Sequence, residues 1–346
     1  MYFRHPVSIL IFVICLHVLA LASFATDRTV KYDFDGDGKT DIAVYREGLF
    51  TPTVRTSSYF YYRKSSTGEI IARPFGAGGD RPAVADYDND GKADLAIFRS
   101  WEETLKYPWE ASNYWIEYST TGAIDVIYQL GYGTIVNRNF VEGPRAELGV
   151  YNGRFEGEPT EGCYIRGFIF ASGPNLYQKD VTDECQIGGI ERIPALGDYD
   201  NDGHSDIAVL VRDRSQRRNA TWQIWYSPFV SGFTTPDFSR RFDVDFPIPG
   251  DYDGDGRSDL AGGSFIRGRL IWTITYSSTG QTGTFAFGLT GDKVVAADYD
   301  GDGWTDPAIF RPSDGNWYIY RTSDANWDVF QFGLATDVLI TQPNAF

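Results

Sequence analysis

The sequence predicts an all-β fold built from repeated units of four short strands. A nine-residue acidic motif recurs at near-regular intervals, short apolar runs alternate with turn residues, and no helical period of useful length appears after residue 26. Of the 346 residues, 37 are Gly and 16 are Pro, which suits many tight turns. Hydrophobic residues (42%) and aromatics (16%) can form a substantial core, so wholesale disorder is excluded.

The acidic motif has the form Asp-aromatic-Asp-x-Asp-Gly-x-x-Asp. Five copies have aspartates at positions 1, 3, 5 and 9: Asp33, Asp35, Asp37, Asp41; Asp86, Asp88, Asp90, Asp94; Asp198, Asp200, Asp202, Asp206; Asp251, Asp253, Asp255, Asp259; and Asp298, Asp300, Asp302, Asp306. A worn motif at 139–147 keeps the spacing but has Val141 and Gly143 at two of these positions. Successive copies start 53, 53, 59, 53 and 47 residues apart, so each marks one unit.

Each unit contains four short apolar runs separated by turns. One run follows the motif (42–46), one opens with an aromatic such as Phe60, one ends in Phe-Gly (75–76), and one leads into the next motif (82–86). Four-stranded units repeated around an axis are the blades of a β-propeller. Six copies predict six blades, and seven are less favoured because no seventh unit is found. A surplus run at 337–341 is expected to complete the first blade and close the ring.

These units resemble the FG-GAP or VCBS repeats of bacterial exported proteins, which are related to the propeller of integrin α chains. The resemblance covers residues 30–341 and rests on the five near-perfect motifs. It implies a calcium-binding propeller that serves as a binding or adhesion module. The worn motif departs from the family pattern, so the resemblance does not extend a metal site to it.

The motif itself indicates a site for Ca²⁺. Gly at position 6 permits a sharp turn that gathers the carboxylates, and hard oxygen ligands in a flexible cage suit this ion. We expect the position-7 carbonyl to be a further ligand and its side chain, which varies from Lys39 to His204 to Trp304, to be unconstrained. Position 12 is never Glu, which excludes an EF-hand. The sequence predicts about five structural calcium ions and an empty worn motif.

The first 25 residues have the features of a secretory signal peptide. A basic start at Arg4 precedes an apolar run from Val7 to Leu21 and small residues ending at Ala25. Cleavage after Ala25 would leave residues 26–346 as a single propeller domain, secreted, at the cell surface or in the periplasm. An uncleaved anchor is the alternative, although the run is short for spanning a bilayer.

Two cysteines, Cys163 and Cys185, lie in the mature chain and in the unit with the worn motif. Cys163 opens its third strand and Cys185 is near the end of its fourth, so the sequence predicts a disulfide across the hairpin. Two separate buried thiols are the alternative. We expect a disulfide to stabilise this blade in place of a bound metal ion.

The composition excludes or disfavours several classes of binding partner. With 31 Lys and Arg against 47 Asp and Glu, the net charge is -16, which disfavours nucleic acid and anionic membranes. His5 and His17 belong to the signal segment, so His204 is the one remaining histidine and a multi-histidine zinc site is excluded. We expect no membrane insertion after cleavage, and a monomer.

The predicted function is a binding or adhesion module for a glycan or protein ligand. The loops on the face away from the acidic motifs are elaborated, and Trp101 and Trp109 mark the expected ligand face, together with Phe50 and Arg55. Packing of the two tryptophans against their own loop is the alternative. A polysaccharide hydrolase or lyase is a less favoured function, with these carboxylates available: Glu102, Glu103, Glu156 and Glu161. A structural unit without a ligand is the third possibility.

Overall fold

The computed structural model describes residues 31–99, 113–128, 134–135, 148–151, 167–172, 175–180, 190–213, 220–227 and 235–340. These residues form strands, turns and short connections, and the strands pair into six four-stranded antiparallel sheets. In this part of the chain, no helix is long and apolar enough to cross a membrane. The all-β prediction is confirmed.

The strands have the following bounds, sheet by sheet from the innermost strand outward: β24 (Val338–Leu339), β1 (Ile42–Arg46), β2 (Ser57–Arg63), β3 (Ile70–Ala77); β4 (Arg81–Pro82), β5 (Leu95–Arg99), β6 (Asn113–Glu117), β7 (Ile124–Tyr128); β8 (Thr134–Ile135), β9 (Leu148–Tyr151), β10 (Gly167–Ser172), β11 (Asn175–Asp180); β12 (Ile190–Pro194), β13 (Ile207–Asp213), β14 (Thr221–Trp225), β15 (Phe238–Arg241); β16 (Phe246–Pro247), β17 (Leu260–Ile266), β18 (Arg269–Thr275), β19 (Thr282–Leu289); β20 (Lys293–Val294), β21 (Ala308–Arg311), β22 (Asn316–Tyr320), β23 (Trp327–Gln331).

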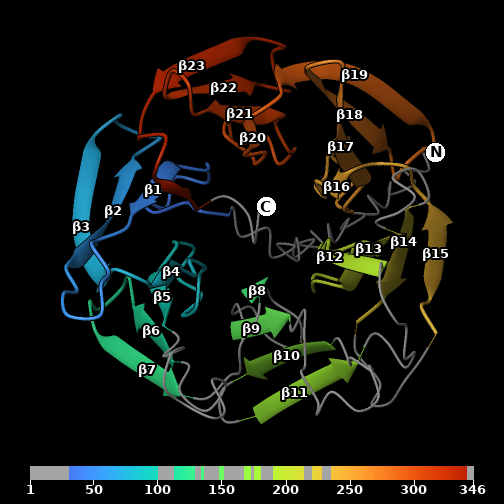
Figure 1. Ribbon diagram of the computed structural model, residues 1–346. Coiled ribbons are helices and arrows are strands. Elements are labelled where there is room, and N and C mark those ends of the chain that lie inside the picture. Colours follow the sequence, from blue (N-terminus) through green and yellow to red (C-terminus); the bar gives the residue numbers. More distant parts are fainter. Residues whose placement is uncertain are drawn as a thin grey trace, which may run out of the picture.

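The sheets follow one another around a central axis, with the short innermost strands at the centre and β3, β7, β11, β15, β19 and β23 at the rim (Figure 1). This arrangement confirms a β-propeller with four-stranded blades. The first blade takes its innermost strand from the end of the chain, since Val338 and Leu339 of β24 pair with Tyr45 and Val44 of β1. The closing strand predicted at 337–341 is therefore formed.

The buried aromatics lie at the positions that the repeat indicates. The aromatic of the third strand is fully buried in the five blades whose side chains are described, in the order Phe60, Tyr114, Trp222, Trp272 and Trp317. Second strands such as β1 and β5 have four consecutive buried residues, because neighbours cover both of their faces. Third strands such as β22 alternate between buried and partly exposed residues, as expected closer to the rim.

The tyrosine at motif position 2 holds four of the acidic motifs against the end of the innermost strand; the motif at 33–41 has Phe34 there. Tyr87 Oη donates to the Ala83 carbonyl and Tyr252 Oη to the Ile248 carbonyl, at 2.5 and 3.0 Å. Tyr199 and Tyr299 make the equivalent bond four residues back. In these four motifs the bond positions the first aspartate shortly after the blade's first strand.

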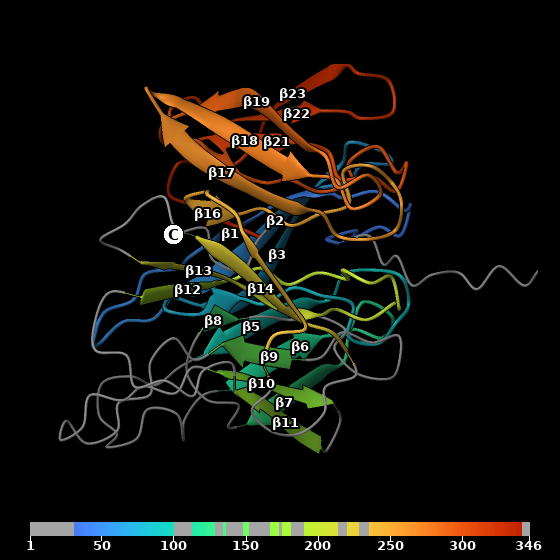
Figure 2. The same cartoon turned by 90° about the vertical axis from the view of Figure 1, so that its right-hand side faces the viewer.

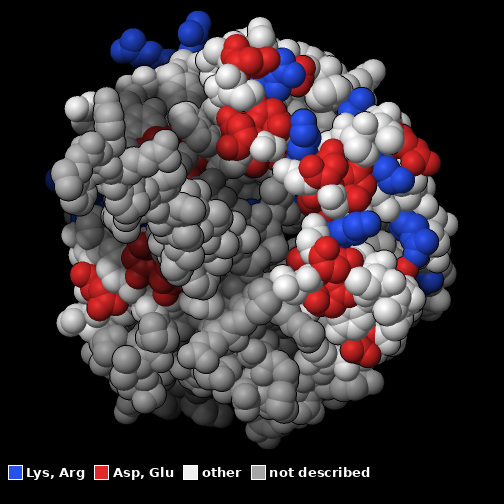
Figure 3. All heavy atoms as spheres, turned by 180° about the vertical axis from the view of Figure 1, so that it is seen from behind, with Lys and Arg blue, Asp and Glu red and all other residues white. Residues whose placement is uncertain are grey.

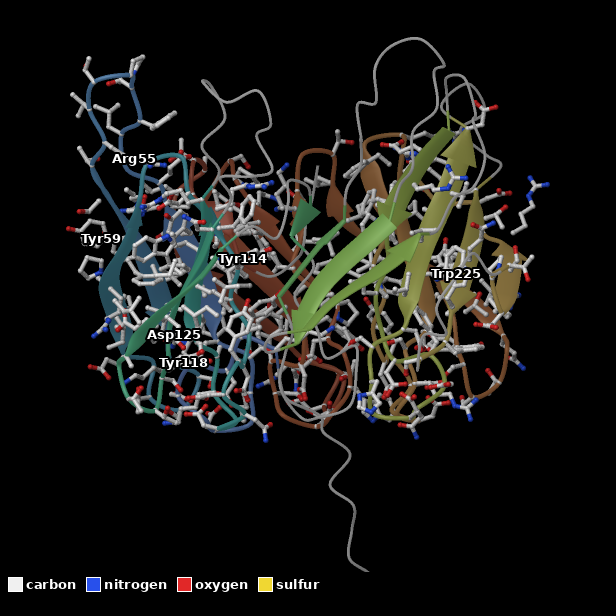
Figure 4. All side chains as sticks on the ribbon, turned by 90° about the horizontal axis from the view of Figure 1, so that it is seen from below. Arg55, Tyr59, Tyr114, Tyr118, Asp125 and Trp225 are labelled. Atoms are coloured by element: carbon white, nitrogen blue, oxygen red, sulfur yellow. The ribbon has the colours of Figure 1, made fainter. Side chains whose placement is uncertain are left out.

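The two faces of the ring carry different connections. Strands run between the faces (Figure 2), so loops joining the first and second strands and turns joining the third and fourth share one face. We call this the acidic face; the opposite face has the loops between the second and third strands. Arg55 and Tyr118 lie at these two ends of the molecule (Figure 4). The N-terminal segment, Trp101, Trp109, Cys163, Cys185 and the worn motif lie outside the described residues.

Candidate metal centres

The acidic loops, residues 33–41, 86–94, 198–206, 251–259 and 298–306, each gather three carboxylates. We name each loop by its first residue. In loops 33, 86, 251 and 298 the aspartates at positions 1, 3 and 5 have oxygens within 4.8 Å of one another, and in loop 198 the group is Asp198, Asp200 and Asp206. The acidic clusters are spaced around the described part of the face, with Lys and Arg between them (Figure 3). The structure thus brings together three of the four aspartates predicted in each loop; position 9 lies outside the group in four loops, and Asp202 lies outside it in loop 198.

The position-1 aspartate shapes the loop through backbone amides. Asp33 Oδ1 accepts from Gly36 N at 2.6 Å, and its Oδ2 accepts from Gly38 N at 2.8 Å. The second bond requires a left-handed turn, and Gly38 has φ of +82°. The position-6 glycines of the other four loops have φ between +84° and +91°. The sharp turn predicted at position 6 is confirmed.

The position-9 aspartate ties the loop to the hairpin between the third and fourth strands. Asp41 is fully buried; its Oδ2 accepts from Phe34 N at 2.8 Å and its Oδ1 from Ser65 N at 2.6 Å. Asp94, Asp206, Asp259 and Asp306 are equally buried and accept the same two amides. Sequence reasoning treated position 9 only as a ligand and did not foresee this structural role.

Burial raises the pKa of these carboxyls because desolvation penalises the charged form, and the backbone amides offset part of that effect. The pKa of Asp41, Asp94 and Asp306 rises to about 6, that of Asp259 to about 7 and that of Asp206 to about 8. Neighbouring carboxylates of the same loops raise these pKa values further. Without a cation, the charged form of these buried carboxyls is therefore disfavoured.

A pair of hydroxyls orients the aspartates at positions 3 and 5. Ser66 Oγ donates to Asp35 Oδ2 at 2.5 Å, and Ser65 Oγ donates to Asp37 Oδ1 at 2.8 Å. Other blades repeat these contacts at position 3 (Thr120–Asp88, Ser278–Asp253, Ser323–Asp300) and at position 5 (Ser119–Asp90, Ser227–Asp202, Thr322–Asp302).

Sequence reasoning missed this hydroxyl pair, although the sequence contains a signal for it. Ser65, Ser119, Ser227, Ser277 and Thr322 each stand two residues after the end of a third strand. Four of them are followed by a second Ser or Thr. The signal lies 16 to 25 residues beyond the end of the motif, in a segment that also has the composition of an ordinary polar turn.

One buried oxygen at position 3 has no hydrogen-bond donor in three loops. These atoms are Asp35 Oδ1, Asp88 Oδ1 and Asp253 Oδ1. In each case the hairpin hydroxyl bonds to Oδ2, so Oδ1 is the oxygen left over. A buried acceptor without a donor costs about 1–3 kcal/mol, and a hard cation would satisfy it. The residues present therefore fit a site for a calcium ion.

Position 7 differs from the prediction in one respect. In three of the five loops the side chain is not unconstrained, because it packs on the preceding loop. A Cβ added to Gly36 would lie 2.7 Å from Lys92 Cε, and one added to Gly301 would lie 3.0 Å from Lys39 Cγ. Trp304 lies against Gly254 in the same way. The variation at position 7 thus reflects different contacts between neighbouring loops.

A hairpin held by several hydrogen bonds extends from the opposite face between β1 and β2. Phe50 pairs with Arg55, and the amides of Thr51 and Val54 each donate to the other's carbonyl. Arg55 Nε donates to the Gly78 carbonyl at 2.6 Å, which anchors the hairpin to the next turn. At its tip, Leu49, Phe50 and Val54 are 57%, 56% and 45% exposed.

Arginines on the opposite face pair with buried aspartates. Arg99 makes two hydrogen bonds to Asp80, at 2.7 and 2.6 Å. Arg311 pairs with Asp292 at 3.0 and 2.9 Å. Arg46 of β1 pairs with Asp337, directly before β24, with two bonds of 2.8 Å. The last pair joins the two ends of the chain at the ring closure.

Comparison with known proteins supports the repeat assignment. Residues 33–97 match the sequence profile described as an FG-GAP-like repeat, which confirms the predicted resemblance over that segment. No curated protein sequence matches the chain. The chain is similar to the crystal structure of a candidate 6-phosphogluconolactonase from Bacteroides fragilis, with a TM-score of 0.31 and 10% identity over 88% of this chain and 96% of that one. At that score and identity, the similarity supports no inference about chemistry.

Proposed function

We propose that this chain is an exported β-propeller, stabilised by calcium, that binds a glycan or protein ligand through its opposite face. An FG-GAP-like propeller suggests a binding module. The observation that carries the calcium assignment is the set of buried, donor-less oxygens Asp35 Oδ1, Asp88 Oδ1 and Asp253 Oδ1 within three-carboxylate clusters. A bound Ca²⁺ would neutralise these clusters and would have a structural role.

Ion content tests the metal assignment directly. Elemental analysis at millimolar Ca²⁺ should find about five ions per chain, one for each acidic loop. Asp37→Ala and Asp302→Ala should each remove one ion. Asp324→Ala is the matched control, because Asp324 lies on the same blade as Asp302 but pairs with Arg321 outside the cluster. Fewer than three ions in the unmodified chain would refute the assignment.

The hairpin at 47–58 supports a ligand site on the opposite face. Its anchored backbone holds Phe50 more than half exposed, with the Arg55 guanidinium 5.2 Å from the ring centroid. Exposed aromatic and apolar side chains on a rigid support favour recognition of a sugar ring or a protein surface. Trp101 and Trp109 remain proposed members of this face.

A glycan array, with and without Ca²⁺, tests the ligand class. A glycan hit should be weakened by Phe50→Ala while the melting temperature stays unchanged, because the ring is largely in solvent. Thr53→Ala, an exposed change in the same hairpin, is the control and should keep binding. Turnover of a bound polysaccharide would favour the hydrolase or lyase alternative instead.

Three further parts of the proposal concern segments whose side chains the structure does not describe. We propose that the sheet β8–β11 serves as the sixth blade, that cleavage after Ala25 exports residues 26–346, and that Cys163 and Cys185 form a disulfide. N-terminal sequencing of the secreted chain tests the cleavage. A thiol assay on denatured, unreduced protein should find no reactive thiol, and two reactive thiols would rule out the disulfide.

A further inference from the structure

Neighbouring acidic loops are joined by a main-chain hydrogen bond that recurs in the same register. The amide at position 8 of one loop donates to the carbonyl at position 1 of the loop before it. The four bonds are Ala93 N to Asp33 O (2.6 Å), Ser258 N to Asp198 O (2.5 Å), Thr305 N to Asp251 O (2.6 Å) and Thr40 N to Asp298 O (2.8 Å). They connect loops 198, 251, 298, 33 and 86 in that order.

Side chains reinforce three of these links. Lys92, Lys39 and Trp304, each at position 7, lie against Gly36, Gly301 and Gly254, which occupy position 4 of the preceding loop. All three glycines also have positive φ, between +73° and +80°. A larger residue at position 4 would clash with the neighbouring loop, and its backbone would be strained at a positive φ.

The hydrogen bond between two loops involves, in each loop, a residue that is an expected calcium ligand or lies next to one. Position 1 contributes a carboxylate to its own cluster while its carbonyl holds the next loop. Position 8 lies between position 7, whose carbonyl is an expected ligand, and position 9, which is buried and ties the loop to its hairpin. An ion bound at one loop would therefore also act on the bond to the neighbouring loop.

We propose that the acidic loops form a belt in which calcium bound at one loop raises the calcium affinity of the adjoining loops. The proposal rests on the proposed calcium sites and adds a coupling between them. The bond from Thr40 to Asp298 joins the last repeat to the first, so the belt crosses the ring closure beside β24. Metal binding would then secure the join between the two ends of the chain.

The first test breaks one link without touching a carboxylate. Ala93→Pro removes the amide that donates to Asp33, whereas Ala93→Gly keeps it. In a calorimetric Ca²⁺ titration, the proline variant should still bind five ions, with two of them about fivefold weaker, and the glycine variant should follow the unmodified chain. An unchanged isotherm in the proline variant would overturn the belt, whereas an unmodified chain that binds no Ca²⁺ would overturn the metal sites themselves.

The second test leaves every linking residue intact, so it holds even where the proline variant fails to fold. The paired change Asp253→Asn and Asp255→Asn disables loop 251. With Ca²⁺ present, hydrogen exchange should become at least about fivefold faster at the amides of Thr305 and Ser258, which join loop 251 to its neighbours, and stay unchanged at Ala93. If each of the three amides exchanges at the same rate in the unmodified and the changed chain, the coupling is overturned.

Discussion

The two faces of the propeller differ in the groups that pair with their buried aspartate carboxyls. On the opposite face, Asp80, Asp292 and Asp337 each accept two hydrogen bonds from an arginine at the end of a second strand. On the acidic face, Asp41 and its equivalents accept backbone amides, which carry no net charge. The chain therefore supplies its own cations on one face, whereas on the other, under the proposed calcium assignment, the cation would come from solution.

The largest expected effect is removal of calcium, which acts on the acidic face alone. A site with a dissociation constant of about 10⁻⁴ M contributes about 1.4 kcal/mol at millimolar Ca²⁺, so five sites contribute about 7 kcal/mol. Because domains are stable by about 5–15 kcal/mol, EDTA should lower the melting temperature substantially. Added Ca²⁺ should restore it and Mg²⁺ should do so poorly. Identical thermal melts with and without EDTA would contradict the comparison.

The next effect is on the pH dependence of the melting temperature, which should have opposite signs with and without calcium. Without metal, the folded-state pKa of Asp41, Asp94 and Asp306 is about 6, above the unfolded value of about 3.9. A raised pKa favours folding below the unfolded value and loses that contribution as pH rises through the folded value. In EDTA the melting temperature should therefore fall from about pH 4 to about pH 7. In saturating Ca²⁺ it should rise over that range, because protons compete with the ion. A rise in EDTA would refute the carboxylate argument.

A third prediction tests the opposite face. Arg311→Met should destabilise the fold by about 3 kcal/mol, because Asp292 would remain buried without its cation. Arg321→Met in the same blade is the control and should cost less than about 1 kcal/mol, since its ion pair with Asp324 is solvent-exposed. Chemical denaturation should give the same loss with Ca²⁺ and with EDTA. A loss seen only in Ca²⁺ would mean that the two faces do not act independently.

The smallest effect concerns the hydroxyl that orients Asp35. Ser66→Ala should weaken one calcium site about tenfold, because groups that orient metal ligands typically affect affinity by that factor. Ser57→Ala is the matched control: this serine is exposed on the same blade and lies away from the acidic loop. A calcium titration separates the two, and equal isotherms would place the hydroxyl outside the metal centre.

Much of the fold could be predicted because its signals are local. The positions of Phe60, Trp272 and Trp317 in third strands, and of glycine at position 6, follow from short-range patterns that repeat five times. The hydroxyl pair and the arginine–aspartate pairs could not be predicted in this way. Ser66 lies 31 residues from Asp35, and Arg46 lies 291 residues from Asp337, so these contacts depend on how strands pair.

The sequence by itself determined the repeated four-stranded unit, the acidic loops and the aromatic core, because strand period, turn residues and ligand spacing are properties of neighbouring residues. The tertiary structure decided the rest. Strand pairing within the first blade brings the hairpin hydroxyls onto Asp35 and Asp37 and leaves one oxygen of Asp35 without a donor. Closing the ring joins loops of neighbouring blades through bonds such as Thr40 to Asp298. These contacts exist only once the strands of a blade have paired and the blades lie side by side, since packing and hydrogen bonding between distant segments depend on position in space and not on order along the chain.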